Sequence, residues 1–154
     1  MRAAAIGLGL CLAAGALAAE TSGVRTLRRG SQSAVEKPLR ESAATREQYV
    51  KLWNRQFRRG PNTEPPPAPP AVDFSREMVL AAFAGQKNTA GYTIEITGAR
   101  EEKGKLVVTV VETTPPPGAI AAQILTYPYH YVAVKKSALP ITWKTVARTA
   151  RPRR

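Results

Sequence analysis

The sequence predicts a small α+β domain, in which an antiparallel β-sheet carries one amphipathic helix packed on it. Two segments, residues 92–97 and 105–112, alternate apolar and polar side chains, as half-buried antiparallel strands do. A third segment, residues 45–57, carries its apolar side chains at helical spacing. The sheet and the single helix that covers it follow from these two periodicities.

Residues 1–19 have the pattern of a secretory signal peptide. A positive start, Met1-Arg2, precedes the apolar run Ala3–Ala14 and the small-residue pattern Ala16-Leu17-Ala18. The apolar run is shorter than the ~20 residues that a membrane-spanning helix needs. We therefore expect cleavage near Ala18 or Ala19 and a secreted or periplasmic protein. The alternative is a short N-terminal anchor that stays attached.

Cys11 is the only cysteine of the chain and lies inside this segment. A lipid-modified cysteine normally follows a small residue, whereas Leu10 precedes this one. Lipid anchoring through Cys11 is therefore not expected. Cleavage downstream would leave a mature chain without a disulfide or a thiolate nucleophile, so that its stability would come from packing.

The length and charge of the chain favour one domain with an anionic partner. The 154 residues, of which 44% are hydrophobic, suffice for a core without covalent cross-links. Lys and Arg number 23 against 11 Asp and Glu, which gives a net charge of +12. This excess favours an acidic protein or an anionic envelope surface as partner. Nucleic acid is not expected as a partner of a secreted chain.

Residues 20–71 predict an N-terminal segment of short strands, one helix and a proline-rich spacer. Gly23–Arg28 and Ala34–Arg40 are expected as short strands, the second placed at a sheet edge by Pro38. Five prolines in the six residues Pro65–Pro70 exclude a helix and favour an extended polyproline II segment. We interpret this run as a stiff spacer, and the alternative is a ligand for an aromatic groove.

The helix of this segment has start and stop signals. Thr45 and Gln48 fit a capping box, in which two side chains satisfy free amides at the helix start. Arg58–Pro61 contains the Gly-Pro pair that ends a helix. The apolar stripe between these signals consists of Tyr49, Val50, Trp53 and Phe57.

Residues 72–140 predict the β-rich body. Met78–Ala84 is apolar throughout and fits a strand buried on both faces, although its alanines also permit a helix. The two alternating strands follow with a charged hairpin at residues 100–104, and Tyr129–Val134 is the last strand. Pro115–Pro117 must lie in a loop, because a central strand cannot lose three donors. The predicted structural turns contain Gly85, Gly91, Pro117 and Gly118.

Residues 141–154 predict a basic C-terminal tail that follows Pro140, where regular structure is expected to end. Its last seven residues contain no acidic side chain and no apolar periodicity, so we expect them to be disordered. One interpretation is a solvated terminus without a specific partner. The alternative is an electrostatic tether to anionic lipids or polysaccharide. The candidate tether residues are Arg148, Arg151, Arg153 and Arg154.

Several landmarks in fixed order resemble the PrcB-type C-terminal domain of secreted or lipid-anchored bacterial proteins. They are Val72-Asp73-Phe74-Ser75, Met78-Val79, Gly85-Gln86-Lys87, Gly91-Tyr92-Thr93-Ile94, Pro116-Pro117-Gly118 and Thr126-Tyr127-Pro128-Tyr129-His130. The resemblance spans roughly Asp73 to Leu139. That family takes its name from an accessory subunit of a surface protease complex, so the resemblance implies a partner-binding or stabilising role and no catalytic residues.

The residues themselves offer little material for catalysis, and we expect no enzyme activity, no cofactor and no metal. After removal of the signal peptide the chain retains one Asp and one His, Asp73 and His130. Counting alone permits a set with Ser75 or Ser137 as nucleophile, but neither serine lies in a Gly-x-Ser-x-Gly elbow. We interpret His130 as a structural residue at the edge of the core, hydrogen-bonded through its ring. One His and scattered carboxylates give no close pair of metal ligands.

Alternate tyrosines suggest a candidate partner-binding face. Tyr127, Tyr129 and Tyr131 share one side of a regular strand, where they either pack in the core or form a recognition surface. Lys135 and Lys136 follow them and would suit an acidic partner. The sequence therefore predicts a non-catalytic envelope protein that binds or stabilises another protein, with a protease as a candidate. The alternative is a surface-binding protein that its basic tail holds to anionic polymers or lipids.

Overall fold

The computed structural model describes residues 23–58, 60–61 and 63–152. The predicted signal peptide, Cys11, Arg153 and Arg154 lie outside these residues. The described elements are, in chain order, β1 (Arg25–Gly30), β2 (Leu39–Ala43), α1 (Arg46–Arg55), β3 (Glu77–Phe83), β4 (Thr93–Glu102), β5 (Lys105–Thr114), β6 (Tyr129–Lys135) and β7 (Ile141–Thr149). Within the described ranges no helix has the length and apolar character that a bilayer crossing requires.

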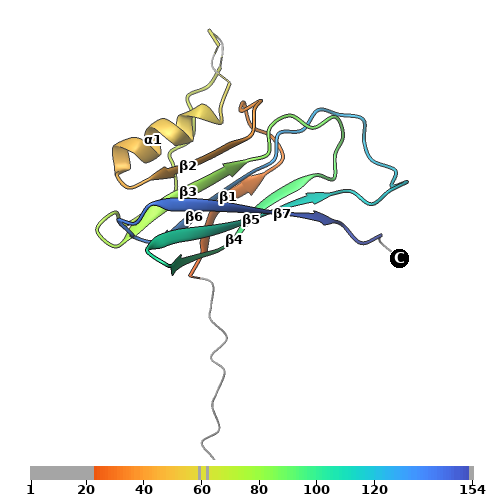
Figure 1. The fold of residues 1–154 in the computed structure, drawn as a ribbon. Helices are drawn as coiled ribbons and strands as arrows, with labels where there is room; N and C mark the ends of the chain where they lie inside the picture. The colour runs from red at the N-terminus through yellow and green to blue at the C-terminus, as the bar shows by residue number, and fades with distance from the viewer. Residues whose placement is uncertain (1–22, 59, 62, 153–154) are drawn as a thin grey trace, which may run out of the picture.

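The elements form three layers, with α1 above a four-stranded sheet and a three-stranded sheet below it (Figure 1). The upper sheet has the order β1-β6-β3-β2 and is antiparallel throughout. The lower sheet has the order β4-β5-β7, with β4 antiparallel and β7 parallel to β5. The predicted α+β class is confirmed, and the predicted single sheet is in fact two sheets packed face to face.

The two middle strands of the upper sheet, β3 and β6, separate two hydrophobic cores. Even-numbered residues of β3, such as Leu80, face the lower sheet and pack with Ile96 and Val108. Odd-numbered residues, such as Phe83, face α1. This two-sided burial explains why Met78–Ala84 is apolar without alternation, since a strand covered on both faces has no polar side. Its interpretation as a doubly buried strand is confirmed.

Helix α1 begins as predicted and ends earlier. Thr45 caps it by accepting a hydrogen bond from the Gln48 amide at 3.3 Å, and the Gln48 side chain accepts from the Ala44 amide at 2.9 Å. The helix buries Tyr49, Leu52 and Trp53 against the upper sheet. The indole of Trp53 donates to the Pro67 carbonyl at 2.7 Å, so the proline-rich segment is held against the helix.

The predicted domain boundary between residues 71 and 72 is wrong. β1 pairs with β6 and β2 pairs with β3, so both edge strands of the upper sheet come from the N-terminal segment. The expected strand over Ala34–Arg40 is also displaced, because β2 begins only after Pro38. Long-range pairing completes the sheet across the proline-rich spacer, and the described residues therefore form one interleaved unit.

The predicted tail is wrong for its first nine residues, because β7 extends the lower sheet from Ile141 to Thr149. All nine residues are in register with β5, from Leu106 opposite Ile141 to Thr114 opposite Thr149. Ile141 and Trp143 pack against the inter-sheet core. β7 is an edge strand with one face on the inter-sheet core and the other face in solvent, which explains its many polar residues. In the sequence such a polar segment resembles a tail. Arg148 thus belongs to a strand.

The predicted turn residues differ in how tightly they are held. Gly85, Gly91 and Gly118 have φ of +75°, +95° and +74°, and Pro117 and Gly118 occupy a turn. A Cβ at Gly85 would lie 2.9 Å from the Glu36 carbonyl oxygen, and one at Gly91 would lie 3.2 Å from Pro115 Cβ. These two positions require glycine for conformation and for space.

We expect Gly91→Val to lower the free energy of unfolding by about 1 kcal/mol or more, because a β-branched residue is strained at positive φ. Thermal unfolding measures this loss. Gly98→Ala is the matched control, since a Cβ there meets nothing within 4 Å and φ is not positive. If Gly91→Val and Gly98→Ala melted at the same temperature as the unmodified chain, the conformational explanation for Gly91 would be wrong.

Candidate functional site

The tyrosines of the last predicted strand lie in the interior. Tyr131 is fully buried beneath α1, and its hydroxyl donates to the Leu52 carbonyl at 3.1 Å. Its ring centroid lies 5.4 Å from that of Trp53 and 5.6 Å from that of Phe83. Burial raises the pKa of Tyr131 and, in the same cluster, raises the pKa of Tyr49 to about 12. The candidate aromatic site is therefore a core.

Tyr127 and Tyr129 are buried as well, which corrects the interpretation of the three tyrosines as a recognition surface. The Tyr129 hydroxyl accepts from Arg28 at 3.0 Å, and the Arg58 guanidinium lies 5.9 Å from the Tyr127 ring centroid. Tyr129 packs with Tyr131 in the core beneath α1, and Tyr127 lies buried just before β6. A partner cannot reach these rings without opening the fold.

The candidate lysines do not flank an aromatic face. Lys135 and Lys136 are exposed, but they lie at the opposite end of β6 from Tyr127. Lys136 donates to the Phe74 carbonyl at 2.7 Å. Their positive charge therefore lies at the end of the molecule where β4 turns into β5, away from the tyrosines.

His130 joins the two sheets. It is 1% exposed on β6, and its Nδ1 accepts from the Ile96 amide of β4 at 2.9 Å. Because a backbone amide only donates, the ring proton lies on Nε2, which donates to Thr26 Oγ1 at 3.0 Å. Burial lowers the pKa of His130 below 6.5. The interpretation of His130 as a hydrogen-bonded core residue is confirmed.

The structure does not bring Asp73, His130 and a serine together. Both His130 nitrogens are occupied as described, and Asp73 accepts from the Ser75 hydroxyl at 2.6 Å in a local turn. That contact lowers the pKa of Asp73. Ser137 donates to Glu101 at 3.0 Å. Among the described residues, no cluster of three His, Cys, Asp or Glu side chains forms that could hold a metal ion.

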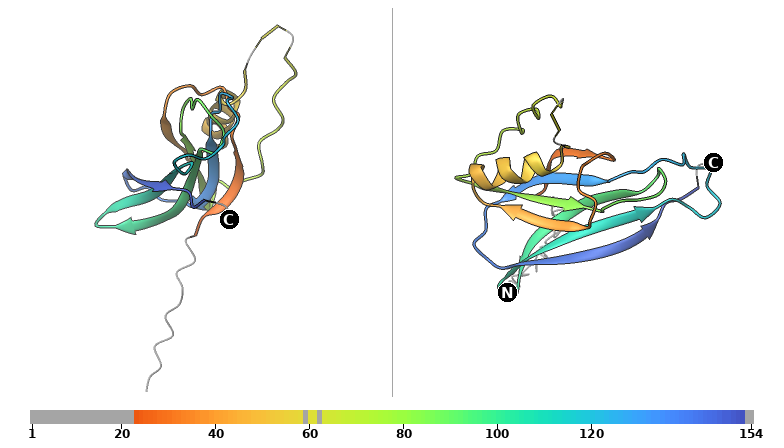
Figure 2. Two further views of the ribbon diagram at one scale, coloured as in Figure 1. Left: turned by 90° about the vertical axis from the view of Figure 1, so that its right-hand side faces the viewer. Right: turned by 90° about the horizontal axis from the view of Figure 1, so that it is seen from above.

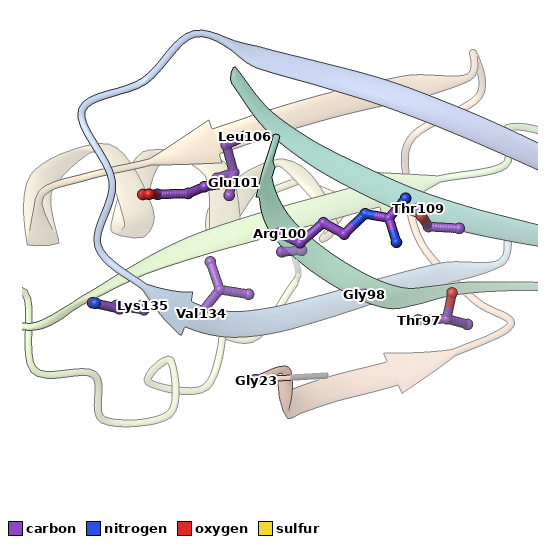
Figure 3. Close-up of a pocket in the computed structure, with 10 residues that line it drawn as sticks. Gly23, Thr97, Gly98, Arg100, Glu101, Leu106, Thr109, Val134 and Lys135 are labelled. Carbon is purple, nitrogen blue, oxygen red and sulfur yellow. The ribbon is translucent and has the colours of Figure 1, made fainter. Parts of the chain in front are cut away.

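A hollow of about 640 Å³ lies at the bulge of β4, beside the end of β6 (Figure 3). The bulge places Thr97 between the paired residues Ile96 and Gly98. Val134 and Lys135 of β6 form the opposite side, as Figure 3 shows. Both charged groups that β4 contributes are paired within the fold, Arg100 with Glu102 at 3.1 Å and Glu101 with Ser137. The hollow has a mixed polar and apolar lining and offers space without an assembled reactive group.

Among the described residues, the outer edge of β7 is an unpaired strand edge with basic side chains beside it. β7 is the last strand of the lower sheet, and no described strand pairs with its outer side. Lys144 and Arg148 project from its solvent-facing side and form no ion pair with any described carboxylate. Of the other candidate tether residues, Arg151 is exposed just beyond β7. The site that the sequence placed in a flexible tail is thus largely a strand edge.

A second exposed feature, the loop of residues 118–125, was missed from the sequence. Ile120 is completely exposed, and Ile124 and Leu125 are each about half exposed. The run of apolar residues after Gly118 lacks both strand alternation and helical length, which is the signal that could have identified it. Figure 2 shows this loop projecting at the same end of the molecule as the C-terminus.

These features define a three-layer α+β domain in which His130 and Tyr131 make buried hydrogen bonds between its layers. The family model of the PrcB C-terminal domain, described as "PrcB C-terminal", matches residues 78–135. This confirms the resemblance for the segment from β3 to β6, which contains the central strands of both sheets. No match was found to a curated protein or to a solved structure.

Proposed function

We propose that this chain is a non-catalytic protein of the cell envelope that binds and stabilises a partner protein, as an accessory subunit of a protease complex. The match of residues 78–135 to the PrcB C-terminal domain carries the proposal. Export by the N-terminal signal peptide is part of it, supported by the Met1-Arg2 start and the apolar run that follows. The buried histidine and tyrosines then have a structural role, and the partner contacts the surface.

The outer edge of β7 is the surface that best suits such a partner. The Leu106 amide donates to the Pro140 carbonyl at 2.9 Å, and the Ala150 amide donates to the Thr114 carbonyl at 2.8 Å. The two groups on the β7 side of these bonds belong to Pro140 and Ala150, the even-numbered residues that flank β7. The pairing of β7 with β5 contains no register shift between them. Because strand groups alternate in direction, the amides and carbonyls of odd-numbered residues, such as Thr145, point outward. An extended segment of a partner can pair with this row as an added strand.

The charges around this edge indicate the chemistry of the partner segment. Lys144 and Arg148 lie on the exposed face of β7, and Glu112 is the last acidic residue of the chain. An added strand that carries Asp or Glu would therefore meet complementary charge. Strand addition supplies the affinity through backbone hydrogen bonds, and the lysine and arginine select an acidic sequence.

Affinity capture from an envelope extract tests the proposal, with the full chain as bait and a peptide of residues 148–154 as control bait. We expect one protein or complex to be enriched on the full chain. Thr145→Pro removes an outward amide and should reduce capture about tenfold, whereas Thr145→Ala keeps the amide and should not. Thermal unfolding verifies that both variants fold.

Two results would overturn this assignment. If the full chain enriches no protein over the peptide, there is no partner of the proposed kind. If a protein is enriched and Thr145→Pro captures it as well as Thr145→Ala does, the partner binds elsewhere and the role of the β7 edge is wrong.

A further inference from the structure

The loop of residues 118–125 presents aliphatic side chains to solvent on a rigid base. Thr126 closes the base, because its amide donates to the Lys87 carbonyl at 2.9 Å and its carbonyl accepts from the Lys87 amide at 2.8 Å. The Ala90 amide donates to the Ala122 carbonyl at 3.0 Å. These bonds fix the loop while Ile120 and its apolar neighbours remain uncovered. The exposure is therefore a built feature of the fold.

The apolar loop adjoins the most basic end of the chain. Arg151 lines a groove of about 650 Å³ together with Ile120 and the backbone around Ala90. Arg148 is exposed where β7 ends at this groove. Residues 113–154 contain no Asp or Glu, so no acidic side chain of this C-terminal segment offsets the arginines. Figure 1 shows the loop and the end of β7 at the same end of the molecule.

We propose that this end of the molecule binds the surface of an anionic bilayer. The side chains of Ile120, Ile124 and Leu125 insert among the acyl chains near the headgroups, and Arg148 and Arg151 contact the headgroup phosphates. A bilayer interface satisfies both groups at once, since it offers an apolar layer beneath a negatively charged one. A soluble polyanion would satisfy the arginines alone and leave the aliphatic residues in water. The proposal does not depend on a partner at β7.

Tryptophan quenching tests the insertion at the loop itself. The full chain with Ile120→Trp is mixed with vesicles of phosphatidylcholine and phosphatidylglycerol that carry brominated acyl chains. We expect strong quenching and a blue shift of the added tryptophan. Glu102→Trp is the matched control. Glu102 is exposed at the end of the lower sheet that lies opposite the end of β7, so a tryptophan there should not be quenched. The unmodified chain supplies the background of Trp53 and Trp143.

Charge and lipid composition provide the second arm of the test. Adding Arg148→Gln and Arg151→Gln to the Ile120→Trp chain should weaken binding to the anionic vesicles on the order of tenfold or more. Vesicles of phosphatidylcholine alone should bind as weakly. Polyphosphate in solution should compete for the arginines without shifting the emission of the added tryptophan.

Three outcomes would overturn the proposal. In the first outcome, the added tryptophan at position 120 is not quenched by anionic vesicles. In the second, vesicles of phosphatidylcholine alone quench it equally. In the third outcome, an envelope protein shifts its emission while vesicles do not, which would make the loop a protein-docking surface.

Discussion

Replacing Tyr131 with alanine is expected to lower the free energy of unfolding by about 3–5 kcal/mol, the range for deleting a large aromatic side chain from a core. The side chain is fully buried and contacts Trp53, Phe83 and Tyr49 around its ring. Its removal leaves a cavity between α1 and the upper sheet that the neighbouring rings fill only in part. Chemical denaturation with circular dichroism measures the loss.

Tyr131→Phe separates the ring from its hydroxyl. The ring remains, but the Leu52 carbonyl loses its donor at 3.1 Å, so we expect a loss of about 1–2 kcal/mol. If Tyr131→Ala were instead as stable as the unmodified chain and only reduced partner capture, the tyrosine would be a surface residue. The assignment of β6 to the core would then be wrong.

Stability is expected to fall as the pH drops below about 6.5, because His130 is neutral in the fold and takes up a proton when the chain unfolds. Burial lowers the pKa of His130 in the folded state. Between that lowered pKa and the ordinary value of 6.5, the unfolded chain binds more protons than the folded one. The free energy of unfolding therefore increases with pH, by at most about 1.4 kcal/mol per pH unit.

The control for this pH dependence is His130→Asn, which leaves the chain without histidine. Asparagine retains an acceptor for the Ile96 amide and does not titrate. The free energy of unfolding of the His130→Asn variant should therefore be nearly constant from about pH 5 to pH 7. Denaturant titrations across that range measure both proteins. If the unmodified chain and His130→Asn showed the same slope, a group other than His130 would cause it.

The local periodicities of the sequence predicted the elements that face a core. Val108 and Val110 of β5, and Tyr49 and Trp53 of α1, repeat at the spacing of the structure that buries them, so each could be assigned without its partners. The parity of His130 with Val132 predicted its buried, hydrogen-bonded state in the same way. These assignments succeed because burial on one face leaves a direct imprint on the sequence.

The features that failed depend on pairing between distant segments. β7 carries no fully buried side chain, so the alternation of Ile141 and Trp143 with polar residues is short, and pairing with β5 is what establishes the strand. For Tyr129 and Tyr131 the sequence left a core position and a recognition surface as alternatives, and only the covering helix decides that they are buried. The exposed Ile120 loop was missed because its apolar composition resembles that of a core segment.

We propose that a partner protein adds a strand to the outer edge of β7. The most direct test is the affinity of the captured partner for Thr145→Pro compared with Thr145→Ala, at a temperature where both variants are folded. We expect Thr145→Ala to bind like the unmodified chain and Thr145→Pro to bind about tenfold more weakly. Equal affinities of the two variants would contradict it.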